Sequence, residues 1–184
     1  MRYLASELSW PKVAQLAKAG AVALVPVGST EAHGPHLPLN VDVVIAEAVC
    51  ARLSARLPVD TVVFPPVAYS LTDFAATFSG TVSLAGDVAL AHLTAVLKGI
   101  GAHFERVAVI NHHLEPAHFQ VVHAAAKAAQ GPNLRIVVPD HRKKPIGPLL
   151  GHEFTHGGSH AGGYETSLML AAAPHLVDEA ARLA

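Results

Sequence analysis

Two short apolar runs of the sequence are each followed by a histidine and a carboxylate. Glu31 and His33 come shortly after the run AVALVPV, and His113 and Glu115 come shortly after the run RVAVI. In an extended segment, residues two apart point to the same side, so each pair can direct a carboxylate oxygen and an imidazole nitrogen at one point. Mixed nitrogen and oxygen ligation of this kind suits Zn²⁺, Mn²⁺ or a similar divalent ion.

Three further residues could take part in metal binding or proton transfer. Asp42 stands at the start of the next expected helix, where it can supply a carboxylate that bridges two ions. Two ions held about 3.5–4 Å apart activate a water molecule and clamp a substrate. His160 and Glu165 lie five residues apart where a glycine-rich loop leads into a helix. Glu165 is therefore a candidate ligand, and His160 is a candidate acid and base or a residue that orients a ligand.

The elements that position these residues alternate along the chain. Short apolar, β-branched runs predict strands at 21–27, 61–64, 106–110 and 134–138. Helical spacing of apolar residues predicts helices at about 9–20, 42–57, 87–100, 115–130, 160–173 and 177–184. This alternation is typical of an α/β fold, here a single-domain three-layer αβα sandwich over residues 1–184 with a mostly parallel sheet. The carboxyl ends of parallel strands share one edge, so both clusters belong to the same site.

The composition indicates which partners and which cellular compartment to expect. Thirteen Lys and Arg residues against 14 Asp and Glu residues give a net charge of −1, which argues against nucleic acid as a partner. Cys50 is the only cysteine, which excludes an intrachain disulfide and fits a reducing compartment. The N-terminus has no signal-peptide pattern, and the apolar runs reach only about a third of a membrane span. We therefore expect a cytoplasmic protein with no membrane partner.

Four motifs resemble those of the creatininase (creatinine amidohydrolase) family. They are GSTEAHGPHLPLNVD at 28–42, FSGTVS at 78–83, NHHLE at 111–115 and HAGGYETSLML at 160–170. The first motif is long and specific, and the resemblance runs from about residue 25 to residue 176. The resemblance implies a creatininase-like αβα fold and a homo-oligomer, often a hexamer in this family.

The resemblance also implies roles for individual residues. One metal ion would be held by Glu31, His113 and Glu115, and the other by His33 and Glu165, with Asp42 bridging them. His160 matches the histidine that passes a proton to the leaving nitrogen. The family hydrolyses cyclic amides and related C–N bonds of small molecules with water activated by two divalent ions. Zinc, manganese or both are the expected cofactors, and iron or cobalt is compatible with the same ligands.

The sequence departs from the family pattern near the middle motif. His112 stands where glycine is usual, and Leu114 and Glu115 replace a common Gly-Gly pair. The creatinine-hydrolysing enzymes place tryptophans in the substrate loop, whereas the only tryptophan here is Trp10, far from any motif. This argues against creatinine itself. The alternatives are a formamide on a pyrimidine nucleotide precursor, a short peptide, a catalytically silent metal-binding subunit, or a structural oligomer without metal.

We expect other polar residues to orient the ligands or to lie around the substrate pocket. We expect His36 to hold a ligand by a hydrogen bond, and His112 and Tyr164 to lie around the ligands or in the substrate pocket. The loop 139–159 is expected to shape that pocket, its histidines contacting substrate or solvent. Other histidines are interpreted as structural or surface residues of helices, namely His92, His103, His118, His123 and His175.

Overall fold

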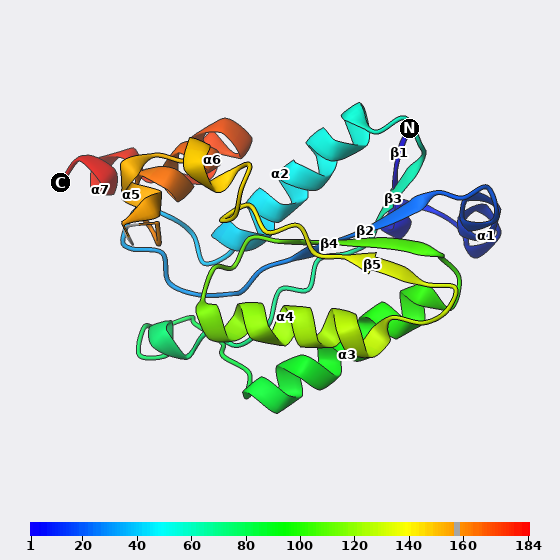
Figure 1. Cartoon of the computed structure of the whole chain (residues 1–184). Helices are drawn as coiled ribbons and strands as arrows, with labels where there is room; N and C mark the ends of the chain where they lie inside the picture. Colours follow the sequence, from blue (N-terminus) through cyan, green and yellow to red (C-terminus); the bar gives the residue numbers. More distant parts are fainter. Residues whose placement is uncertain (157–158) are drawn as a thin grey trace.

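A single parallel sheet forms the centre of the computed structural model, which describes residues 1–156 and 159–184 (Figure 1). Within those residues the sheet has five strands in the order β1-β3-β2-β4-β5. The strands are β1 (Arg2–Leu4), β2 (Val22–Val27), β3 (Thr61–Val63), β4 (Arg106–Asn111) and β5 (Arg135–Val137). All four pairings are parallel, as the sequence predicts.

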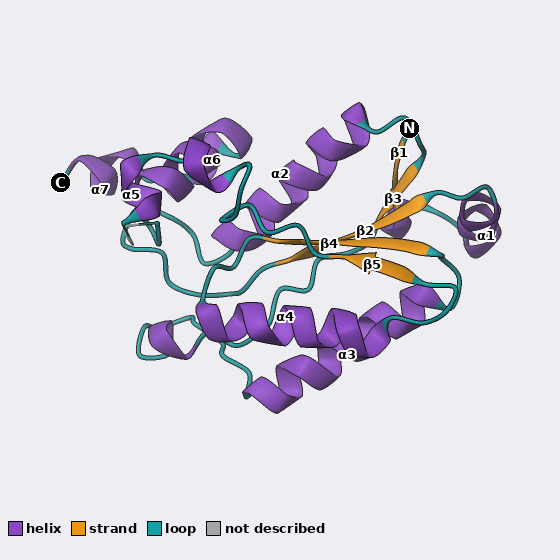
Figure 2. Ribbon diagram, in the orientation of Figure 1, coloured by secondary structure: helices purple, strands orange, loops and turns teal. Residues whose placement is uncertain are grey.

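Helices cover both faces of this sheet. The helices of the described residues are α1 (Trp10–Lys18), α2 (Val41–Arg56), α3 (Gly86–Gly101), α4 (Pro116–Ala129), α5 (His152–Thr155), α6 (Gly163–Ala172) and α7 (Glu179–Leu183). Figure 2 shows α2 on one face, with α6 beside it, and α3 and α4 on the other. The predicted three-layer αβα sandwich is therefore confirmed. No helix in the described part of the chain is long and apolar enough to cross a membrane.

The strands are apolar along their whole length because both faces of the sheet are buried. Alternate residues of β2 and β4 point to opposite sides, so Val25 and Val109 join the core beneath α3 and α4. Leu24 and Ala108 instead pack on the other face with Cys50 of α2. Continuous runs such as AVALVPV are thus explained by two cores, one on each side of the sheet.

The strand order places the two polar loops side by side. β2 lies between β3 and β4, and its last residue, Val27, is in register with Asn111 at the end of β4. The chain therefore leaves these neighbouring strands at one edge, where open parallel sheets bind ligands.

The elements differ from expectation in three places. β1 was not predicted, because three residues carry too little pattern; it forms by pairing with β3. The helix expected from residue 160 begins at Gly163, because Ala161 has a φ of +52° and Gly162 is extended. The stretch 139–159 is also less irregular than expected, since it contains a 3-10 turn (Gly147–Leu149) and α5.

Candidate metal centre

A close approach between β2 and α2 brings the first carboxylates together. A Cβ atom on Gly28 would lie 2.7 Å from both the Cβ of Asp42 and the backbone nitrogen of Val43. Only glycine permits this contact without a backbone shift. The first turn of α2 therefore packs against the end of β2 and places Asp42 beside the loop that carries Glu31 and His33.

Glu31, Asp42 and His113 form the first group of possible ligands. Nδ1 of His113 lies 3.1 Å from Oδ2 of Asp42 and 3.4 Å from Oε1 of Glu31. On the opposite edge of the ring, Nε2 donates a hydrogen bond to the carbonyl oxygen of Leu71 at 2.9 Å. Because a carbonyl only accepts, Nε2 carries the proton, and Nδ1 is left with a lone pair directed at the two carboxylates.

His33, Asp42 and Glu165 form a second group. Nε2 of His33 lies 3.4 Å from Oδ1 of Asp42 and 3.5 Å from Oε2 of Glu165. Nδ1 of His33 donates to the backbone oxygen of Glu31 at 3.1 Å, so Nε2 is the nitrogen left to bind an ion. Asp42 thus belongs to both groups and offers a different oxygen to each.

The buried polar atoms of these groups fit a cation. Among the described residues, Oε1 of Glu31 and Nε2 of His33 are buried without a hydrogen-bond partner. Leaving such atoms unpaired is costly, and a cation between them would satisfy both. Three buried carboxylates, including those of Asp42 and Glu165, also require positive charge nearby.

The pKa values of His33 and Glu165 also indicate that this cluster favours positive charge. Burial opposes protonation of His33, but the hydrogen bond and charge of Asp42 raise its pKa to about 9. Burial, together with the charge of Asp42, raises the pKa of Glu165 to about 7. Both groups bind a proton more tightly than they would in water, and divalent cations can replace such protons.

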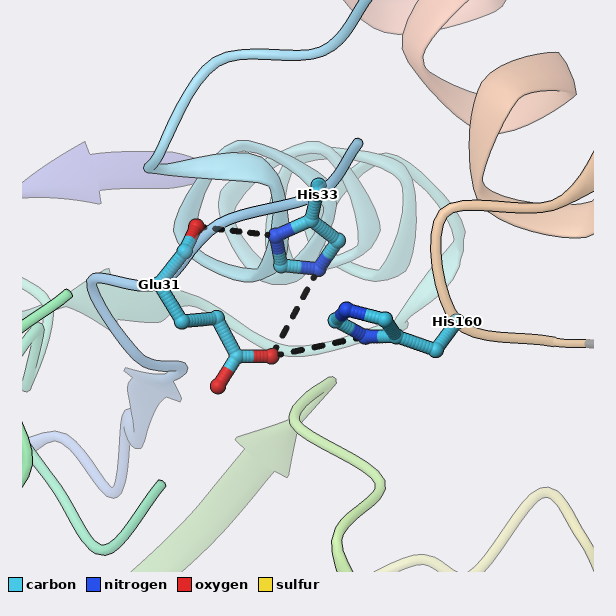
Figure 3. Close-up of side chains that lie close together, drawn as sticks. All are labelled: Glu31, His33 and His160. Atoms are coloured by element: carbon cyan, nitrogen blue, oxygen red, sulfur yellow. Dashed lines mark hydrogen bonds and ion pairs between the residues drawn. The ribbon is translucent and has the colours of Figure 1, made fainter. Parts of the chain in front are cut away.

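His160 lies next to Glu31 and His33 (Figure 3), and unlike them it is partly exposed. Its Nδ1 lies 3.6 Å from Oε1 of Glu31, and its Nε2 donates to the carbonyl oxygen of Ala32 at 3.0 Å. The ring packs 4.5 Å from that of His33 and edge-on to Phe74 at 4.8 Å. Burial and the charge of His33 lower the pKa of His160. This half-exposed imidazole can exchange protons with a bound molecule, and together with Glu31 and His33 it could also ligate an ion.

A cavity of about 400 Å³ opens onto these groups. It is lined by Glu31, Phe74, His113, Leu114, Glu115, Pro116, Ser159, His160 and Glu165. Its size suits a small molecule.

Glu115 lies in this cavity but in neither ligand group. Its Oε2 is 3.6 Å from Nε2 of His113, the edge of the ring that faces away from Asp42. In this geometry Glu115 approaches the other edge of the His113 ring, and its role as a metal ligand stays a prediction. Glu115 is the residue directly before α4.

The other predicted polar residues lie behind the ligands. Nε2 of His36 is 2.9 Å from the hydroxyl of Thr166, and this contact ties the first motif to the helix that carries Glu165. His112 is buried and stacks on Tyr164, with its Nε2 3.2 Å from the phenol oxygen. Neither His112 nor Tyr164 lines the cavity.

Several hydroxyl residues that contact the ligands were not predicted. Ser29 donates to Oδ2 of Asp42 at 2.7 Å, and Thr72 donates to Oε2 of Glu31. Thr72 lies in a Thr- and Ser-containing loop, but its position next to Glu31 arises only in the folded chain. No sequence spacing links the two.

His118 was expected to be a structural or surface residue, and it is fully buried against the site. Burial and the charge of His113 lower its pKa to about 3, so the ring is neutral. Ser70 donates to its Nδ1 at 2.7 Å, and its Nε2 donates to Asn111 at 2.8 Å. Asn111 in turn donates to the backbone oxygen of His113 at 2.8 Å, so this chain of bonds fixes the segment that carries His113.

Comparison with known proteins identifies the family of this chain. The profile of the creatininase (creatinine amidohydrolase) family matches residues 6–184. The creatinine amidohydrolase of Pseudomonas putida is 31% identical over 194 residues, covering 94% of this chain and 72% of that protein. The chain therefore belongs to the creatininase family, whose members are metal-dependent amidohydrolases.

Two further relatives extend the comparison. A creatininase structure in its Mn form superposes with a TM-score of 0.82 at 27% identity, over 97% of this chain and 76% of that one. A mycofactocin precursor peptide peptidase of Mycobacterium ulcerans is 29% identical over 178 residues, covering 93% of this chain and 66% of that protein. Relatives thus include both a small-molecule amidohydrolase and a peptidase.

Proposed function

We propose that this protein is an amidohydrolase that holds two divalent ions and cleaves a C–N bond of a small molecule. The bond would be that of an amide, a cyclic amide or a formamide. The observation that carries the proposal is the position of Asp42, which offers Oδ2 to the group of His113 and Oδ1 to the group of His33. A buried carboxylate shared by two sets of ligands is what a pair of ions requires.

The ligand groups define the two ion positions. Glu31, Asp42 and His113 would hold one ion, and His33, Asp42 and Glu165 the other. Carboxylate and imidazole ligands favour zinc or manganese, with iron or cobalt compatible. The chemistry that such ions supply when bound is polarisation of a carbonyl oxygen and a lower pKa for water.

The side chains around the cavity supply the proton transfers. Glu115 faces the cavity, and its buried Oε2 has no hydrogen-bond partner among the described residues. We assign it to the substrate side of His113, where it can accept a proton. His160 also lines the cavity. Because its Nε2 donates to the carbonyl oxygen of Ala32, its Nδ1 would first take up the proton that the attacking water releases and then pass it to the departing nitrogen. Phe74 packs against His160 and restricts the orientation of its ring.

A second candidate reaction is hydrolysis of a peptide bond in a short peptide. The similarity to a mycofactocin precursor peptide peptidase over most of the chain supports it. The same ligands and proton donors would serve, because a peptide bond is an amide. We therefore do not restrict the proposal to non-peptide bonds.

Metal content per chain tests the proposal. Elemental analysis of protein purified without chelator should give about two equivalents, and Asp42→Ala should lose both metal and hydrolysis. Asp87→Ala is the matched control, because Asp87 also lies in the first turn of a 16-residue helix but is exposed and outside both ligand groups. Retention of two equivalents by Asp42→Ala would contradict the shared ligand.

His160→Ala separates ligation from proton transfer. We expect unchanged metal content and a turnover reduced by about 10²–10⁴-fold on a panel of cyclic amides, formamides and dipeptides. Loss of metal in this variant would make His160 a ligand. Two equivalents of metal without hydrolysis of any compound in the panel would instead favour a catalytically silent metal-binding subunit.

The proposal also includes a cytoplasmic location and a homo-oligomer, a hexamer by family resemblance. A single buried thiol, Cys50, is compatible with a reducing compartment. Sedimentation velocity of the purified protein would measure the oligomeric state, and a purely monomeric species would contradict this part of the proposal.

A further inference from the structure

A second cavity of about 450 Å³ adjoins the one that opens onto the ligand groups. The two cavities share the side chains of Leu114 and Ser159, so a molecule bound in one can extend into the other. Arg142, Lys144 and Phe154 line only the second cavity. This cavity takes no part in the chemistry proposed above.

The charges that line the two cavities are opposite. The first is lined by three carboxylates, those of Glu31, Glu115 and Glu165. The second has two cationic side chains, and no acidic residue of the described chain lines it. An anionic group would therefore be attracted to the second cavity, whereas the carboxylates of the first are directed at the proposed ions.

Arg142 is held in place before any ligand arrives. Its Nε and Nη2 donate to the two carboxylate oxygens of Asp140 at 2.9 and 3.0 Å. Its guanidinium also lies over the ring of Phe119, 3.3 Å from the centroid. Asp140 offsets part of this charge, but the guanidinium is fixed at the cavity wall and little side-chain entropy is lost on binding.

Lys144 provides the second and less restrained charge. It is exposed, and no carboxylate in residues 1–156 or 159–184 forms an ion pair with it. The neighbouring Lys143 instead pairs with Asp140 at 3.5 Å and does not line the cavity. The positive charge is thus directed into the cavity by Lys144 and Arg142, not by every cation of the loop.

We propose that the substrate carries an oxyanion, either a carboxylate or a phosphate, which binds between Arg142 and Lys144 while its C–N bond lies in the first cavity. This inference rests on the proposed function, and it adds the substrate class. A neutral cyclic amide alone would leave the cationic cavity unused. A small molecule with an amide-type bond at one end and an anionic group at the other would fill both.

Binding of paired hydroxamates to the metal-loaded full chain tests the inference, because the two oxygens of a hydroxamate chelate divalent ions and anchor it in the first cavity. Alkyl hydroxamates of several lengths would end in a methyl, a carboxylate or a phosphonate group, and calorimetry would measure Kd. At the best length, the anionic end should bind at least about tenfold more tightly than the methyl end. A larger gain for phosphonate would indicate a phosphate substrate, and a larger gain for carboxylate would indicate a carboxylic acid.

Lys144→Gln should remove most of this preference, while Lys143→Gln, an equal change in charge on the next residue, should retain it. Arg142→Lys tests the second cation with its charge preserved, and it should weaken anion binding because it loses the fixed guanidinium geometry. If two metal ions are present and the methyl, carboxylate and phosphonate compounds bind equally at every length, this inference is overturned and the proposed function is not. An equal loss in Lys143→Gln and Lys144→Gln would also overturn it. Absence of both metal and hydroxamate binding would overturn the proposed function, and this inference with it.

Discussion

Nδ1 of His113 lies 3.1 Å from Oδ2 of Asp42, and both side chains are almost completely buried. Two chain segments more than 70 residues apart are brought together here, one entering α2 and the other leaving β4. Each partner has a second contact that sets its orientation, from Leu71 for the histidine and from Ser29 for the aspartate. The ligand geometry therefore depends on residues that would not themselves touch an ion.

Thr72→Val should weaken metal binding without removing a ligand. Thr72 donates a hydrogen bond to Oε2 of Glu31, and loss of this bond frees the carboxylate to rotate away from His113. Loss of such an orienting contact typically reduces metal affinity by about 10–100-fold. Competition with a chromophoric chelator would measure it. Thr94→Val, on α3 and away from the ligand groups, should leave the affinity unchanged, and an equal effect of both substitutions would contradict the argument.

Glu115→Gln distinguishes a metal ligand from a cavity carboxylate. Because Glu115 lies on the far edge of His113 and in neither ligand group, we expect the variant to keep about two equivalents of metal and lose most of its turnover. Elemental analysis and a steady-state assay on one preparation would give both values. A drop to one equivalent would instead support the role that the family resemblance implies.

The sequence spacing of the polar residues predicted which of them lie together where they come directly after a strand. Glu31 and His33 come together because β2 ends just before them, and the parallel order brings β4 and His113 to the same edge. Glu115, two residues after His113, approaches the other edge of that ring, so a spacing of two did not by itself fix the geometry here.

Contacts between distant segments could not be predicted in this way. Ser70 and His118 are 48 residues apart, and their hydrogen bond depends on how the loop after β3 packs on α4. The start of α6 was missed for a local reason, since Ala161 adopts a positive φ that its residue type does not signal. The amide of Ala161 donates to Oε2 of Glu165 at 2.7 Å, and this bond accompanies the unusual turn.

Cys50 should make the protein less stable at alkaline pH. Burial and the charge of Glu47 raise the pKa of its thiol to about 12, whereas an exposed thiol has a pKa of about 8.5. Above about pH 8.5 the unfolded chain loses this proton and the folded chain keeps it, so the free energy of unfolding falls with pH by up to about 1.4 kcal/mol per unit. Urea unfolding between about pH 8 and 10 would measure this slope for the wild type and for Cys50→Ala. Identical slopes would show that the thiol does not contribute.

Gly28→Ala should damage both the fold and the site, because the new Cβ would lie 2.7 Å from the Cβ of Asp42 and from the backbone nitrogen of Val43. Neither atom belongs to the end of a flexible side chain, so the end of β2 or the first turn of α2 must move. We expect the free energy of unfolding to fall by about 1–3 kcal/mol. Metal affinity should fall as well, since the displaced residue is the one shared by both ligand groups.

Gly99→Ala is the matched control for this substitution. Gly99 lies inside α3, and a Cβ there meets nothing within 4 Å, so the change should raise stability by up to about 1 kcal/mol through helix propensity. Urea unfolding and metal titration of both variants would separate a general effect of added methyl groups from the specific contact at Gly28. If Gly28→Ala kept wild-type stability and affinity, the close packing of β2 on α2 would not be what positions Asp42. If Gly28→Ala lowered metal affinity but left the free energy of unfolding unchanged, the substitution would displace Asp42 without destabilising the fold.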